Sequence, residues 1–135
     1  NLALVLDSQG KYDESEALNR RTLEGREKIL GPDHPTTLPS LKNLAQVLKS
    51  QGKYYKSEVM HRRELEGCEK ILGPGHPDTL ISVSNLASVL QSQGKYKESE
   101  TMHRHALEQR KKILVPDHPK TQLSANNLAR VLRLQ

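Results

Sequence analysis

The sequence predicts an all-α protein, a solenoid in which antiparallel helix pairs stack one after another. The first observation is a segment that opens with Asn-Leu-Ala and closes with Gln-Gly-Lys-Tyr, at 1–12, 43–54 and 85–96, and that opens again at 127. Its period is constant at 42 residues, which is typical of stacked-repeat proteins. The second is that apolar residues recur at three- and four-residue spacing, as on one face of a helix. The third is that short connectors rich in Gly and Pro separate the helices, so successive helices must be antiparallel neighbours.

We expect a single repeat array over residues 1–135, with repeats that start at 1, 43, 85 and 127. Because the chain begins and ends inside a repeat, we expect it to be a segment of a longer solenoid. The helix pairs at about 36–72 and 78–114 are complete, and those at the two ends are partial. The predicted helices span about 1–9, 13–30, 36–51, 55–72, 78–93, 97–114 and 120–135.

The first helix of each pair carries a regular apolar stripe. A glycine in the Gln-Gly-Lys-Tyr turn (Gly52 or Gly94) is expected to end this helix. The stripe consists of Leu38, Leu41, Leu44, Ala45 and Leu48 in one repeat, and of Leu80, Val83, Leu86, Ala87 and Leu90 in the next.

The second helix of each pair has a less regular stripe and a glycine inside it. Gly25 and Gly67 should each cost about 1 kcal/mol relative to Ala. Gln109 stands at the same place in the next repeat, so we expect that the glycine is not required. The predicted stripe consists of Leu18, Leu23, Ile29 and Leu30, and then of Met60, Leu65, Cys68, Ile71 and Leu72.

The histidines do not form a pattern typical of a metal site. His34, His76 and His118 follow one another at 42 residues, one in each connector, so they cannot converge on one ion; we expect them to form loop hydrogen bonds or to pack beside proline. His61 and Cys68 share one face of a helix, but two ligands make a poor site. His103 and His105 face different ways. We expect no metal and no cofactor, and the absence of a Gly-rich phosphate loop further indicates that the chain is not an enzyme.

The net charge of the whole chain is +5. The charge of each repeat becomes more positive along the chain, from −1 over residues 1–42 to +1 over 43–84 and +3 over 85–126. A basic protein can attract nucleic acid or an anionic membrane. RNA binding is nevertheless the less favoured class, because RNA readers depend on base stacking and the four Tyr lie at turns. No stretch of about 18 apolar residues predicts a membrane span. The single Cys68 fits a reducing compartment, so we expect a cytoplasmic location.

These motifs together resemble tetratricopeptide repeats. The 42-residue form, with Lys-Ile-Leu-Gly-Pro-x-His-Pro at the close of each unit, is similar to the repeats of kinesin light chain. It is more similar still to the near-identical arrays at the C-terminal end of NLR-like (NB-ARC or NACHT) signalling ATPases. This sequence departs from the family where Ala is usual: Ser15, Ser57 and Ser99 occupy one such position, and Thr22, Glu64 and Ala106 another. Glu64 is the exception there, since a carboxylate at a helix–helix contact must reach solvent or a partner.

The resemblance implies a right-handed superhelix whose concave groove, lined by first helices, binds a peptide or protein. It therefore implies a non-catalytic scaffold, either the ligand-sensing region of an NLR-like protein or a cargo-adaptor segment of the kinesin-light-chain type. The Asn of each Asn-Leu-Ala matches the position at which such repeats hold a ligand's backbone or carboxylate. An internal hydrogen-bond ladder between repeats is the alternative role. With the polar residues beside it, the predicted site consists of Lys42, Asn43, Gln46, Lys49, Ser50, Ser84, Asn85, Ser88, Gln91, Asn126, Asn127, Arg130 and Arg133.

Two further expectations concern partners. Lys42 and Lys49 on this face lead to Arg130 and Arg133, so we expect an acidic ligand that docks toward the C-terminal end. Apolar residues of the last predicted helix have no second helix to cover them, so we also expect end-to-end self-association.

Overall fold

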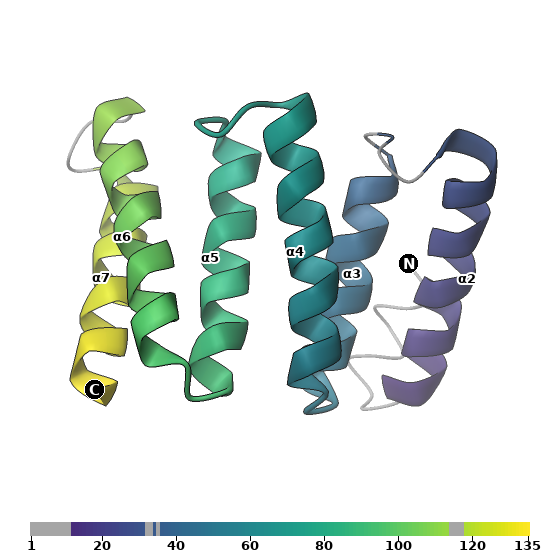
Figure 1. Ribbon diagram of the computed structural model, residues 1–135, viewed down its shortest axis with the longest axis horizontal. Helices are drawn as coiled ribbons and strands as arrows, with labels where there is room; N and C mark the ends of the chain where they lie inside the picture. The colour runs from purple at the N-terminus through teal and green to yellow at the C-terminus, as the bar shows by residue number, and fades with distance from the viewer. Residues whose placement is uncertain (1–11, 32–33, 35, 114–117) are drawn as a thin grey trace. The chain divides into compact units, whose positions relative to one another are not determined.

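The computed structural model describes residues 12–31, 34, 36–113 and 118–135, which form six α-helices and no strand. The all-α prediction is therefore confirmed, and each helix begins and ends within one residue of its expected bounds. The predicted helix 1–9 lies outside the described residues. The helices are α2 (Tyr12–Leu30), α3 (Thr37–Ser50), α4 (Tyr54–Ile71), α5 (Pro77–Ser92), α6 (Tyr96–Ile113) and α7 (Pro119–Leu134) (Figure 1).

The chain divides into two compact units, Asn1–Gly67 and Cys68–Gln135, with the boundary inside α4. In the first unit α2 packs on α3, and in the second α6 packs on both α5 and α7. Helices that follow one another run in opposite directions within each unit (Figure 1).

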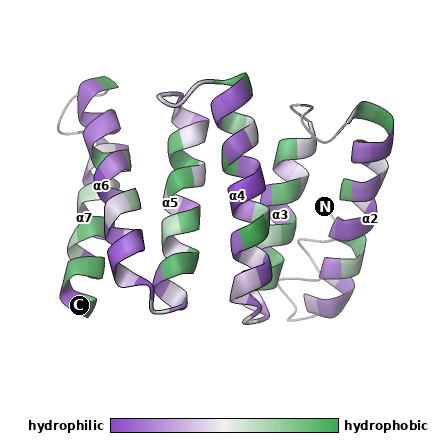
Figure 2. Cartoon of the chain, viewed as in Figure 1, coloured by the Kyte–Doolittle hydropathy of each residue, from purple (hydrophilic) through white to green (hydrophobic). Residues whose placement is uncertain are grey.

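The core of both units is the apolar stripe of the first helices, as predicted. The ten stripe residues of α3 and α5 are all buried, and the largest exposed fraction among them is 6 %, at Leu38. Figure 2 shows these helices as predominantly apolar, whereas α4 and α6 are largely hydrophilic.

The predicted stops of the first helices are confirmed at Gly52 and Gly94. Both glycines have positive φ, +80° and +81°, which residues with a Cβ rarely adopt. After Gly52 the amide of Lys53 donates back to the carbonyl of Leu48 at 2.8 Å, and Lys95 does the same to Leu90 at 2.9 Å. Free carbonyls at the helix ends are thereby satisfied.

The connector histidines form loop hydrogen bonds, as expected. His76 Nδ1 accepts from the backbone N–H of Asp78, and His118 Nδ1 from that of Lys120, both at 3.1 Å. Each histidine thus caps the helix that begins with the proline after it. His34 Nδ1 accepts from the Thr36 amide at 3.2 Å.

The second helices bury less of their stripe than the sequence predicts. Leu23 and Cys68 are buried, but the Ile-Leu pairs at the helix ends are exposed: Ile29 and Leu30 in α2, and Ile71 at the end of α4 with Leu72 directly after it. Leu18, Met60 and Leu65 are half-buried. The prediction was wrong for the Ile-Leu pairs because they lie in the last turn, beyond the part of the helix that the stripe of the first helix covers.

The glycine inside the second helices has different surroundings at its two positions. A Cβ built at Gly67 would lie 2.5 Å from Cδ2 of Leu38, which is itself buried. A Cβ at Gly25 would have no neighbour within 4 Å. Gly67 therefore allows a close approach to α3, whereas Gly25 only lowers helix propensity.

The serines that replace the usual Ala of the second helices hold each helix pair together. Ser57 Oγ donates to the carbonyl of Ala45 at 2.7 Å, and Ser99 Oγ to that of Ala87 at 2.8 Å. All four residues are fully buried. Within the part of the chain that the structure describes, no helix is long and apolar enough to cross a bilayer.

Candidate functional site

The predicted site residues of α3 lie on its solvated side. Lys42, Asn43 and Lys49 are half-buried, and Gln46 and Ser50 are exposed. Their neighbours in sequence, such as Leu44 and Leu48, are completely buried in the core. The helix therefore separates a polar face from an apolar face, as the sequence predicts.

On α5 the predicted residues Ser84, Asn85, Ser88 and Gln91 are all half-buried. The side-chain Nδ2 of Asn85 and Oγ of Ser84 are shielded from water, yet neither has a hydrogen-bond partner. Ser88 Oγ donates to the Ser84 carbonyl at 3.1 Å. Because buried polar atoms are nearly always paired, the unpaired amide and hydroxyl are an exception among the described residues of α5.

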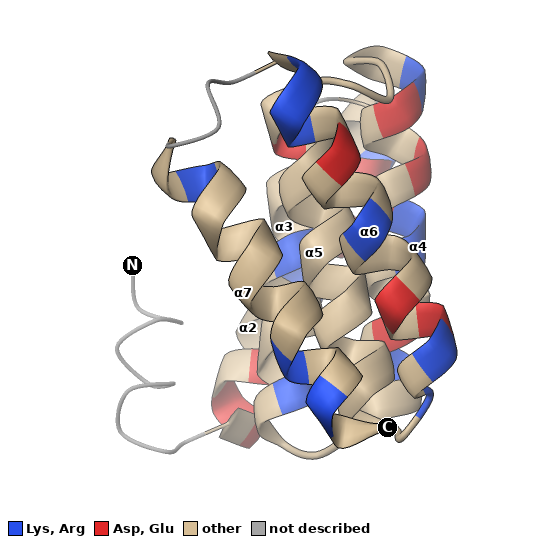
Figure 3. Cartoon of the chain, turned by 90° about the vertical axis from the view of Figure 1, so that its left-hand side faces the viewer, with Lys and Arg blue, Asp and Glu red and all other residues tan. Residues whose placement is uncertain are grey.

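On α7 the predicted residues are more exposed. Asn127 is half-buried, whereas Asn126, Arg130 and Arg133 are exposed. No ion pair of Arg130 or Arg133 with a described carboxylate is present. Figure 3 shows Lys and Arg positions on α7, and this helix contains no Asp or Glu.

The asparagines of the predicted site make no hydrogen bond within the described parts of their own units. Among the described residues, Asn43, Asn85 and Asn127 form no hydrogen bond with one another or with any other side chain or backbone group.

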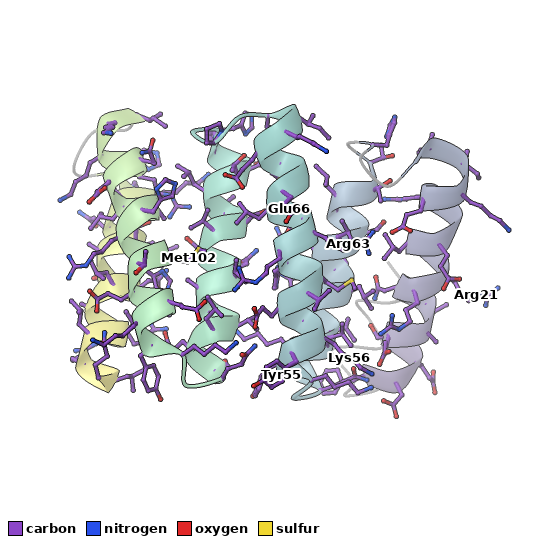
Figure 4. The ribbon with its side chains drawn as sticks, in the orientation of Figure 1. Arg21, Tyr55, Lys56, Arg63, Glu66 and Met102 are labelled. Atoms are coloured by element: carbon purple, nitrogen blue, oxygen red, sulfur yellow. The ribbon has the colours of Figure 1, made fainter. Side chains whose placement is uncertain are left out.

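Three arginines of the second helices are paired with carboxylates one turn away. Arg20, Arg62 and Arg104 each donate through Nε to a glutamate four residues earlier, at 2.7, 2.7 and 3.0 Å. Lys53 also pairs with Glu16 at 2.9 Å, and this bond is the main reason that the pKa of Glu16 falls to about 2. Figure 4 shows the mixed charge on these helices, with Arg63 and Glu66 both on α4. Such neutralised surfaces are not typical of nucleic-acid binding.

Sequence reasoning missed a side-chain bond that recurs at the starts of two first helices. Arg26 Nη1 donates to the Thr36 carbonyl at 2.8 Å and to Ser40 Oγ at 3.0 Å. Arg110 Nη1 donates to the Lys120 carbonyl at 3.2 Å and to Ser124 Oγ at 2.5 Å. In the repeat between them Cys68 takes the arginine's place, and its Sγ lies 3.7 Å from Ser82 Oγ. The sequence does contain a sign of this bond: in every repeat a serine stands fourteen residues after the position of the arginine.

Two buried histidines occupy equivalent positions on α4 and α6. His61 Nδ1 lies 3.5 Å from Oε1 of Glu64, and neither atom forms a hydrogen bond. His103 is buried, which together with the nearby positive charge of Arg130 lowers its pKa to about 4. Within the described ranges, no three His, Cys, Asp or Glu side chains converge so that they could hold a metal ion.

Comparison with known proteins identifies the fold and the family. A sequence profile described as Tetratricopeptide repeat matches residues 1–66 and 78–135. No curated protein matches the chain. Among solved structures, the chain is similar to the kinesin light chain nearly identical TPR-like repeats of Podosopora anserina, with a TM-score of 0.90 and 25% identity over 98% of this chain. A variant of the same repeats matches with a TM-score of 0.89 and 25% identity over 96% of this chain.

A third structure, BtubC (BKLC) from P. vanneervenii, matches with a TM-score of 0.88 over 98% of this chain; at 19% identity it supports the fold alone. The chain spans 63%, 61% and 53% of the lengths of these three structures. The profile covers nearly all of the sequence, and the helix pairs have the geometry of the matched repeats. The chain therefore belongs to the tetratricopeptide-repeat family.

Proposed function

We propose that this chain is a non-catalytic scaffold that binds a peptide or protein segment on the polar face of α3, α5 and α7. Tetratricopeptide repeats generally bind protein partners and are generally non-catalytic. The observation that carries the proposal is the recurrence of an unbonded asparagine at the same position of α3, α5 and α7. Asn43, Asn85 and Asn127 recur every 42 residues, are half-buried, and make no hydrogen bond with any described group. A side-chain amide both donates and accepts, so it can pair with a peptide backbone of any sequence.

The proposed ligand is acidic and docks toward α7. Lys42 and Lys49 contribute positive charge on α3, and Arg130 and Arg133 on α7 have no described carboxylate partner. Attraction between exposed charges acts over about 8 Å at physiological salt, so these residues would guide an acidic peptide onto the face. We also propose that residues 1–135 bind the peptide as a single repeat array.

Selection from a random peptide library tests the proposal. Changing Asn43 and Asn85 together to Ala should weaken the binding of the selected peptide by about 1–3 kcal/mol, because polar groups of the peptide lose their hydrogen-bond partners. The melting temperature should change little, since neither side chain bonds to the protein. Lys56→Ala, on the exposed side of α4, is the control and should bind as the unmodified chain does.

Two outcomes of this experiment would contradict the proposal. One is a loss of folding in the asparagine variant with unchanged affinity per folded molecule, which would indicate a structural role. The other is a selected consensus rich in Lys and Arg, which would exclude an acidic ligand.

We propose that the parent protein is an NLR-like signalling ATPase in which this region senses a ligand. A cargo adaptor of the kinesin-light-chain type is the second candidate, and the similarity to kinesin light chain TPR-like repeats favours it. The neighbouring domain distinguishes the two, because an NLR-like protein carries a nucleotide-binding ATPase and the adaptor carries a heptad coiled coil. A cytoplasmic location is proposed for either, and the single cysteine of the chain, Cys68, fits it.

Self-association through α7 is also proposed. Leu132 is 42 % exposed, whereas Leu90, at the same position of α5, is completely buried beneath α6. Ala129 is likewise exposed, and its equivalent Ala87 is bonded to Ser99 of α6. The exposed face of α7 around Leu132 and Ala129 therefore corresponds to the face of α5 that is covered by α6, the second helix of its pair. A second copy that meets this face would form a head-to-tail contact, which closes into a ring or extends as a filament.

Light scattering over a range of concentrations measures this association directly. The average mass should rise with concentration, and Leu132→Glu should keep it at the monomer value, because the contact would bury an unpaired carboxylate. Val59→Glu makes the same change at an exposed apolar residue of α4 and should leave the association intact. A constant monomer mass for the unmodified chain at millimolar concentration would contradict the proposal.

A further inference from the structure

The second unit contains a small pocket between the end of α6 and the starts of α5 and α7. Its surface is almost entirely apolar, and its volume is about 80 Å³. An engineered cavity of about 150 Å³ holds benzene, so this pocket has room for about three or four carbon atoms. A Val or Leu side chain has that size. The lining residues are Pro77, Leu80, Arg110, Ile113, His118 and Lys120.

The pocket has a buried floor and an opening to solvent. Leu80 and Arg110 are buried, whereas Pro77, Ile113 and Lys120 are exposed. The guanidinium of Arg110 donates to two oxygen atoms of α7. Because the lining is apolar, Arg110 and Lys120 contribute mainly their alkyl chains to it. An uncharged aliphatic side chain of a partner therefore fits the pocket, and a charged one would lose its hydration there.

Three lysines near the opening make it positive. Lys120 lines the pocket itself, and Lys111 and Lys112 lie in the last turn of α6 (Figure 3). All three are exposed, and none has an ion pair with a described carboxylate. Asp78, at the start of α5, is a carboxylate on the same side of the unit, and the lysines outnumber it. The opening therefore attracts an acidic partner.

The preceding repeats lack this positive charge. Lys111 and Lys120 stand where the repeat before has Glu69 and Asp78, 42 residues earlier. The first repeat has Glu27 and a threonine at these positions. The helices form with either sign of charge there, so the two lysines are not required for the fold. Their charge is available for a partner of the third repeat.

We propose that this pocket anchors an acidic peptide segment of a partner protein. One Val or Leu side chain of the segment enters the pocket, and Asp or Glu residues beside it face the three lysines. The volume selects the size of the anchor, and the lysines select the charge of its neighbours. A membrane surface fits less well, because the apolar surface is recessed, whereas lipid binding needs apolar side chains that project from the protein. The site does not include the asparagine face and does not rest on the proposed function.

An NMR titration of the ¹⁵N-labelled intact chain tests the proposal. The probe is a peptide with one Leu between two Asp on each side, acetylated and amidated at its ends. It should shift the backbone amide signals of Leu80, Ile113 and Lys120. Replacing its Leu by Ser, or all its Asp by Asn, should weaken binding by about tenfold or more, because the anchor or the charge is lost. Equal binding of the three peptides would overturn the proposal.

Lys120→Asp and Lys97→Asp are a matched pair of variants. Each lysine is exposed and is the second residue of its helix, and the chain has an aspartate at both corresponding positions, Asp78 and Asp13. Lys120→Asp should weaken binding of the Leu peptide by about fivefold or more, and the addition of Lys111→Glu by about tenfold or more. Lys97→Asp lies at the other end of α6, beyond the screening length of about 8 Å, and should change binding less than twofold. Equal effects at positions 120 and 97 would contradict the proposed site.

Ile113→Ser tests the pocket wall without a change of charge. It should weaken binding of the Leu peptide, whereas Ile71→Ser, at the corresponding exposed position of α4, should not. Equal binding by the unmodified chain and Ile113→Ser would overturn the proposal.

Two further arms separate this site from other surfaces. Vesicles of phosphatidylcholine and phosphatidylserine test a membrane as the partner. Vesicle binding that Lys120→Asp abolishes, with no binding of the Leu peptide, would replace the proposal by a membrane surface. Changing Asn43 and Asn85 to Ala should leave binding of the Leu peptide unchanged, so the two proposals can fail separately. A loss of binding in that variant would place the peptide on the asparagine face and overturn the pocket.

Discussion

Ala106→Glu is expected to destabilise the fold by about 3 kcal/mol, because it places a carboxylate at a position that is closed to solvent. Ala106 is completely buried on α6. The equivalent residue on α4 is Glu64, which is 6 % exposed; its Oε1 lies 3.5 Å from His61 Nδ1 and forms no hydrogen bond with a described group. The chain therefore already has a glutamate in one repeat, at the position where Ala106→Glu would place one in the next repeat.

The reverse change, Glu64→Ala, should raise the free energy of unfolding by about 1–3 kcal/mol, the cost of a buried polar group that is left unpaired. Urea denaturation at pH 7 measures both variants. Glu66→Ala, two residues away and exposed, is the control and should stay within about 0.5 kcal/mol. A lower stability for Glu64→Ala would show that the pair with His61 stabilises the fold.

Lowering the pH from 7 to 4.5 is expected to weaken the fold through His103. Its pKa is about 4 in the folded chain against an ordinary value of 6.5. The unfolded chain therefore takes up a proton first, and stability is lost as the pH falls from about 6.5 toward 4. Once it is complete, this loss in the free energy of unfolding is about 3 kcal/mol. Glu16 does not contribute in this range, because its lowered pKa of about 2 removes stability only below its ordinary value of 4.5.

His103→Asn should remove much of this pH dependence, and Asn19 shows that the position accepts Asn. Denaturation at pH 7 and at pH 4.5 gives the difference for each variant. His105→Asn changes an exposed histidine on the same helix and should leave the difference unchanged. The explanation would be wrong if the two variants lost the same stability between these pH values.

The sequence was sufficient to predict the helices and the core of the first helices. The constant period of the repeat fixes which residues are equivalent, and Gly52 and Gly94 mark the ends of the first helices. The apolar stripe that includes Leu44 and Leu86 has helical spacing, so it predicts the buried face directly. The polar face follows from the same periodicity, since residues such as Asn43 and Gln46 fall opposite that stripe.

The second helices were less predictable for a physical reason. Their stripe is short and irregular, so the sequence does not reveal that Ile71 lies beyond the covered part of the helix. The close approach of Leu38 to Gly67 and the bonds of Arg110 depend on distances between helices, which no spacing in the sequence gives.

The central claim is that the asparagine face holds the ligand, and the side-chain amide signals of Asn43, Asn85 and Asn127 test it most directly. With a selected peptide added to the ¹⁵N-labelled chain, these Nδ2 signals should shift at the same peptide concentration as the rest of the bound protein. Slower exchange with solvent should accompany the shift, because the amides become hydrogen-bonded. Shifts confined to α4 and α6, with the three asparagine signals unchanged at saturation, would contradict the account.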